Sequence, residues 1–149
     1  MNEDRIAAVA RHRLREHLDR VPYEALPEDL RLDDLDQAYA AQRSLLRLLE
    51  DNGRGAVAGY KIAITSKAIQ DLVGLDRPCG AAILAGSVHQ SPSEMAIGDF
   101  IRLGLEFELA VRLGRDMPAS AGPYDAETVG DFIDTCMASF ELIEDRAAD

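Results

Sequence analysis

Two carboxylates, Glu106 and Glu108, lie two residues apart in a segment that otherwise has the pattern of a β-strand. Leucine, phenylalanine or valine occupies every odd position from 103 to 113, and this alternation is typical of a strand with one apolar face. Both glutamates therefore project from the opposite face, about 7 Å from each other at their bases. Because two ionised carboxylates at that spacing repel each other, a hard divalent cation such as Mg²⁺ would explain the pair.

An ordinary solvated sheet surface explains the pair equally well. Arg102 and Arg112 share the face of the two glutamates and could form ion pairs with them. A third carboxylate would favour the cation, and Glu141 in the strand-like segment "FELIEDR" is the candidate. Taken alone, Glu141 is explained more simply as a solvated residue at a strand edge.

Lys61 stands in the middle of the apolar segment "AGYKIAIT". Lysine is almost never fully buried without a partner, so its position needs an explanation. A structural ion pair is the commoner cause of such a placement. The functional alternative is a cation in a closed site, with a pKa low enough to exchange protons.

The elements that would position these side chains follow from periodicity, caps and turns. Asp33 or Asp34 can cap one helix, which Gly53 can end, and Gly74 can end a second. The predicted helices cover residues 4–19, 33–52, 66–73 and 126–137. The predicted strands cover 56–65, which is expected to be buried, 101–114 and the segment 139–146. This is a mixed α/β or α+β protein, with a helical N-terminal region of residues 1–55 and a strand-rich region of residues 56–149 in one domain overall.

Composition limits the functional classes. The 149 residues are 47% hydrophobic and 29% charged, with a formal net charge of −11, which is typical of a globular protein. Such acidity disfavours a nucleic-acid surface and docking on anionic lipid. The charged N-terminus lacks the apolar core of a secretory signal, and no apolar run is long enough to span a membrane. We therefore expect a cytoplasmic protein with free thiols at Cys79 and Cys136.

Four segments together resemble the 2-keto-4-pentenoate hydratase family of the fumarylacetoacetate hydrolase superfamily: "GYKIAITSKAIQ", "GLDRP", "LEFELAVRLGRD" and "FELIEDR". The resemblance covers essentially the whole chain and implies the mixed β core of that superfamily. It also implies that Glu106, Glu108 and Glu141 hold Mg²⁺ or Mn²⁺, and that Lys61 is an active-site residue. The implied reaction adds water to a small anionic 2-hydroxydienoic or 2-oxo acid in the catabolism of aromatic compounds.

The chain departs from the family in two ways. Hydratases of this family commonly carry an acidic residue after the proline of the turn, where this chain has Cys79. Family members are also considerably longer, so the core predicted here is incomplete. Decarboxylation, C–C hydrolysis and a non-catalytic role as an assembly partner therefore stay open. The implied assembly is a homo-oligomer or a partner chain that completes the fold.

Overall fold

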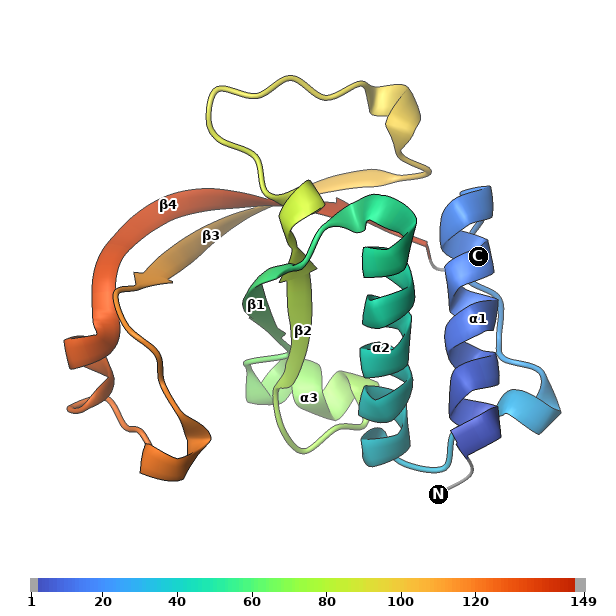
Figure 1. Ribbon diagram of the computed structural model, residues 1–149, viewed down its shortest axis with the longest axis horizontal. Coiled ribbons are helices and arrows are strands. Elements are labelled where there is room, and N and C mark those ends of the chain that lie inside the picture. Colours follow the sequence, from blue (N-terminus) through green and yellow to red (C-terminus); the bar gives the residue numbers. More distant parts are fainter. Residues whose placement is uncertain (1–2, 147–149) are drawn as a thin grey trace. The chain divides into compact units, whose positions relative to one another are not determined.

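The computed structural model describes residues 3–146 and divides them into two compact units, residues 3–96 and residues 97–146. The first unit contains the predicted helical region together with a β-hairpin and a short helix. The second unit contains a long β-ribbon (Figure 1). No helix within residues 3–146 combines the length and the apolar character needed to cross a bilayer.

Two long helices form the body of the first unit. Helix α1 covers Glu3–Asp19 and helix α2 covers Leu35–Leu49, as predicted, and the two lie side by side (Figure 1). Arg5, near the start of α1, forms hydrogen bonds with residues at the start of α2. Its Nη2 atom donates to Asp33 Oδ2 at 2.6 Å and to Gln37 Oε1 at 2.8 Å. The two helices therefore run in the same direction, and the intervening segment returns along them.

Local capping explains where the helices begin and end. The side chain of Asp34 accepts a hydrogen bond from the Gln37 backbone N–H at the start of α2. A π-helical turn, Glu50–Arg54, follows α2 and contains Gly53 at φ 80°, a left-handed conformation that favours glycine. The predicted start and end of this helix are both confirmed.

A hairpin and a short helix complete the first unit. Strand β1, Val57–Ala63, pairs antiparallel with strand β2, Cys79–Leu84. Helix α3, Lys67–Val73, lies between them in the sequence and is capped by the Ser66 side chain. Gly74 ends α3 in the left-handed conformation, at φ 73°, as the sequence predicted.

The second unit is built on an antiparallel ribbon. Strand β3 covers Leu103–Leu113 and strand β4 covers Ile133–Glu144. Their register sets Glu106 opposite Glu141 and Glu108 opposite Ser139. Because side chains alternate between the two faces of a strand, these four polar residues share one face of the ribbon.

The helix predicted over residues 126–137 is wrong. A short 3-10 turn, Val129–Phe132, lies in the middle of this range, and β4 begins directly afterwards at Ile133. The apolar spacing in this segment suits a helix locally. Pairing with the whole length of β3 provides a longer hydrogen-bonded ladder, and tertiary pairing of this kind overrides weak local preference.

The buried apolar core is small and lies in the first unit. Among the described residues, the buried apolar side chains are Val9, Ala10, Ala41 and Leu84. Strand β1, expected to be buried, is exposed instead: Tyr60 and Ile62 keep 80% and 73% of their surface accessible. The reason is that β1 belongs to a sheet of only two strands in the described chain, so no further layer covers it.

Candidate metal centre

Three carboxylates converge on the polar face of the β3–β4 ribbon. Glu106, Glu108 and Glu141 each offer one oxygen atom, and these oxygens lie within 4.8 Å of one another. The convergence follows from the register, because Glu106 faces Glu141 directly across the ladder while Glu108 is two residues further along β3. Glu106 and Glu108 are exposed and Glu141 is half-buried. The site is therefore an acidic cluster on a regular, hydrogen-bonded scaffold.

The arginines of this face have other partners. Arg112 donates to Asp134 Oδ2 at 2.9 Å and to Thr135 Oγ1 at 3.1 Å. Hydrogen bonds from Thr135 and from Arg112 lower the pKa of the Asp134 carboxyl. Arg102 forms an ion pair with Asp145, with 3.5 Å between Arg102 Nη1 and Asp145 Oδ2. The Arg112 side chain thus pairs along the ribbon with β4, and the alternative in which Arg112 forms an ion pair with Glu106 or Glu108 is not seen among the described residues.

Like charges this close are unfavourable without a compensating cation. Within residues 3–146, no lysine or arginine forms an ion pair with Glu106 or Glu108. All the donors are carboxylate oxygens, the ligand type that Mg²⁺ and Ca²⁺ prefer. Three ligands on one face of an octahedron around Mg²⁺ lie about 3 Å apart, so modest rotation of these side chains would bring their oxygens to that spacing. The donor set fits a hard divalent cation.

The remaining predicted site residue, Lys61, lies in the first unit, as does Cys79 at the position where the family commonly has an acid. Lys61 is an exposed residue of β1, opposite Ala81 of β2. Cys79 is the first residue of β2, where it is half-buried and its thiol is free. Asp76, the nearest acidic residue before Cys79 in the sequence, accepts hydrogen bonds from Arg77 Nε at 2.7 Å and from Arg77 Nη2 at 3.1 Å. These bonds hold the pKa of the Asp76 carboxyl below its ordinary value, so it is poorly suited to donate a proton at neutral pH.

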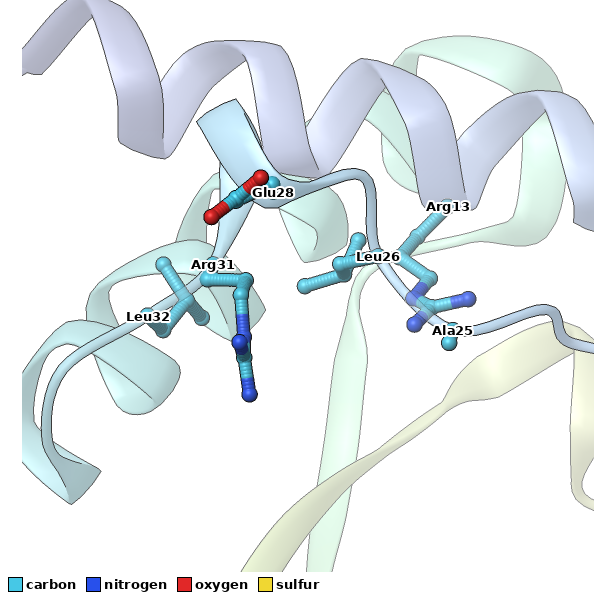
Figure 2. A pocket seen from close by; sticks show the side chains of 6 residues that line it. All are labelled: Arg13, Ala25, Leu26, Glu28, Arg31 and Leu32. Carbon is cyan, nitrogen blue, oxygen red and sulfur yellow. The ribbon is translucent and has the colours of Figure 1, made fainter.

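A surface cleft of about 740 Å³ also lies in the first unit, beside α1 (Figure 2). It is lined by Arg13, Ala25, Leu26, Glu28, Arg31 and Leu32. The Arg13 guanidinium is already engaged: it donates to Glu16 Oε2 at 2.7 Å and to the Glu24 carbonyl at 3.1 Å. None of the sequence-predicted site residues lines this cleft.

Sequence reasoning missed one polar residue beside the acidic cluster. Ser139 is half-buried and pairs directly with Glu108 across the ladder, so its hydroxyl shares the face of the three carboxylates. The register that sets these two residues opposite each other was not readable from the sequence, because the beginning of β4 was predicted as helix.

Sequence comparison identifies several related proteins. The chain is 31% identical over 119 residues to 2-keto-4-pentenoate hydratase from Burkholderia vietnamiensis, a match that covers 78% of this chain and 43% of that protein. It is 31% identical over 128 residues to 2-keto-4-pentenoate hydratase 2 from Dechloromonas aromatica, covering 84% of this chain and 47% of that protein. It is also 31% identical over 116 residues to 2-oxo-hept-4-ene-1,7-dioate hydratase from Escherichia coli, covering 75% and 41%. The chain thus spans less than half the length of these curated relatives. No protein-family model matches it.

Structural comparison confirms the fold class. The chain superposes on 4-oxalocrotonate decarboxylase from Pseudomonas putida G7 complexed with magnesium and adipate, with a TM-score of 0.79 at 20% identity. The calcium and acetate complex of the same enzyme gives a TM-score of 0.82 at 18% identity. Both matches cover 99% of this chain and 55 or 56% of the decarboxylase chain. The fold described here therefore corresponds to about half of a larger one.

Proposed function

This chain belongs to the 2-keto-4-pentenoate hydratase family, whose members it matches over 78 and 84% of its length, and we propose that it forms the metal-binding part of a lyase. The proposed reaction adds water to a 2-hydroxy-2,4-dienoate or 2-oxo-enoate in the breakdown of aromatic compounds. The observation that carries the proposal is the convergence of three carboxylate oxygens within 4.8 Å on a chain of this ancestry. A cytoplasmic location stays a prediction.

In this proposal Glu106, Glu108 and Glu141 hold Mg²⁺, or alternatively Mn²⁺. When bound, the cation supplies Lewis-acid stabilisation of the negative charge that develops on the oxygens of a 2-oxo acid. The protein contributes a rigid scaffold, because two of the carboxylates come from β3 and the third faces them from β4. The three carboxylates also anchor a cation that offsets the repulsion between an acidic protein and an anionic substrate.

Lys61 is proposed to hold or move a proton as the dienol becomes a 2-oxo acid. A lysine on a strand can reach a reacting atom with a compact ammonium group, which can hold or release a proton. The variants Lys61→Arg and Lys61→Met separate charge from proton transfer. We expect both to retain Mn²⁺ binding. We also expect Lys61→Arg to lose turnover almost as fully as Lys61→Met, because arginine stays protonated. Recovery of turnover in Lys61→Arg would contradict this role.

Cys79 favours a second candidate, decarboxylation of a 2-oxo acid. A thiol stands where an acid that could assist water addition is expected, whereas loss of CO₂ needs mainly stabilisation of the resulting enolate charge. Product analysis separates the two reactions: hydration of 2-keto-4-pentenoate yields a hydroxylated 2-oxo acid without gas release. We expect Cys79→Asp to raise hydration if hydration is the native reaction. CO₂ release by the unaltered chain would instead support the decarboxylase.

The primary test is direct metal binding. Isothermal titration with Mg²⁺, and electron paramagnetic resonance with Mn²⁺, should show one site on the unaltered chain and strongly weakened binding for Glu141→Gln. Equal affinity in the variant would refute the assignment. Assembly belongs to the same proposal: a second copy, or a polypeptide that completes the fold, is expected to join this chain in the active enzyme.

A further inference from the structure

The face of the β3–β4 ribbon opposite the carboxylates is apolar over most of its length, with Glu144 opposite Leu103 at one end. Phe107, Leu109 and Phe140 keep 82%, 69% and 61% of their surface exposed. Phe107 faces Phe140 across the ladder, with ring centroids 5.2 Å apart. Further apolar side chains extend the same face at partly exposed positions: Leu103, Leu105, Val111 and Leu142. Single exposed apolar residues are ordinary, but a contiguous patch of this kind marks an interaction surface.

This ribbon needs a further layer. In the described chain its sheet has two strands, so the outer edges of β3 and β4 carry unpaired backbone groups. A two-stranded ribbon is marginally stable in water, and stability requires further strands or a covering element on the apolar face. Long, flat apolar edges also promote aggregation unless something pairs with them. The structure therefore points to an occupant that covers the face and pairs with the edges.

The unpaired edges of the ribbon argue against a second copy of this chain stacked only on its apolar face. Face-to-face stacking of two ribbons would cover apolar side chains but would leave the outer backbone edges of β3 and β4 without hydrogen-bond partners in the described chain. An occupant that packs on the face and also pairs with the edges would satisfy both requirements.

We propose that the apolar face and edges of the β3–β4 ribbon are covered by a polypeptide equivalent to the part of the hydratase fold that this chain does not match. The matched relatives are more than twice as long as the matched region, since it covers 41 to 47% of them. The solved decarboxylase retains 44 to 45% of its chain outside the matched region. The proposal names the partner that the proposed function expects, and it rests on that proposed function only through the family relationship. It depends neither on metal binding nor on the reaction.

The experiment uses the 149-residue chain and, as a separate polypeptide, the segment of the Burkholderia vietnamiensis hydratase that it does not match. The two are co-expressed and purified in EDTA, and native mass spectrometry measures their complex. We expect a heteromer with equal numbers of the two polypeptides, together with slowed hydrogen exchange of β3 and β4 amides. Because EDTA removes divalent ions, complex formation without later Mg²⁺ binding would refute the proposed function while supporting this surface.

Two neighbouring substitutions on opposite faces provide the matched control. Leu109→Asp places a charge on the apolar face, and Ala110→Asp places the same charge on the polar face. We expect Leu109→Asp to reduce the yield of heteromer at least tenfold and Ala110→Asp to change it less than twofold. Circular dichroism should show that α1 and α2 remain helical in both. Three results would overturn the proposal: no heteromer with the unaltered chain, equal loss in both variants, or a homodimer that only Leu109→Asp disrupts.

Discussion

The substitution Glu106→Gln should have opposite effects on stability without and with metal. The three carboxylate oxygens lie within 4.8 Å of one another, so each pair of charges repels by about 0.9 kcal/mol in water. Neutralising Glu106 removes two of the three repulsions, about 1.7 kcal/mol, and physiological salt roughly halves this value. In EDTA the variant should therefore be more stable than the unaltered chain by about 1 kcal/mol, or roughly 2–4 °C in melting temperature.

With Mg²⁺ the order should reverse. Binding to the folded state alone stabilises a protein by about 2.7 kcal/mol at one hundred times the dissociation constant. The variant lacks one of three charged ligands, and we expect its dissociation constant to rise at least tenfold, which is about 1.4 kcal/mol. Differential scanning calorimetry in EDTA and across a Mg²⁺ series measures both effects.

Glu127→Gln is the matched control, because it makes the same chemical change at an exposed position of the same unit. It should leave both the melting temperature in EDTA and the response to Mg²⁺ unchanged. A Glu106→Gln variant that is less stable than the unaltered chain in EDTA would contradict repulsion among the carboxylates, and equal stabilisation of the two proteins by Mg²⁺ would contradict Glu106 as a ligand.

Three further substitutions test the first unit. Ser66→Ala removes the hydroxyl that caps α3 and should lower the free energy of unfolding by about 1 kcal/mol, measured by urea denaturation; an unchanged midpoint would contradict the cap. Gly86→Ala should cost more, roughly 2 kcal/mol, because the added Cβ would lie 2.7 Å from the Arg54 carbonyl oxygen. Hydrogen bonds from Arg5 and Gln37 hold the pKa of Asp33 below its ordinary value of 3.8. The contribution of ionised Asp33 to the free energy of unfolding is therefore fully present above pH 3.8, and it is lost as the pH falls through the lowered pKa of Asp33 in the folded state. Carboxyl NMR should show the Asp33 titration moving upward in Arg5→Gln, and an unmoved titration would refute this link.

Local signals were sufficient for much of the fold. The cap at Asp34 and the left-handed glycine at position 74 depend on neighbours within one helical turn, so the sequence alone located α2 and α3. The alternation that predicted β3 is likewise local. These elements follow from short-range periodicity and stereochemistry.

Long-range pairing could not be read in the same way. Residues 126–137 carry apolar spacing compatible with a helix, and only the ladder between Val111 and Cys136 explains why this part of the chain is extended. The exposure of Tyr60 on β1 could not be predicted for a similar reason, because the burial of a strand depends on layers that lie elsewhere in the fold. The sequence singled out the three glutamates that the structure brings together, whereas the position of Ser139 beside them required the register.

The direct opposition of Glu106 and Glu141 has a consequence for the ribbon itself. Like charges facing each other across a ladder destabilise strand pairing, and a divalent ion bound by both carboxylates would remove that repulsion. A divalent ion held there would act as a removable cross-link between strands that are distant along the chain. Metal binding and the register of β3 with β4 would then be coupled. A slip of one residue would turn Glu141 to the apolar face and abolish the bridge.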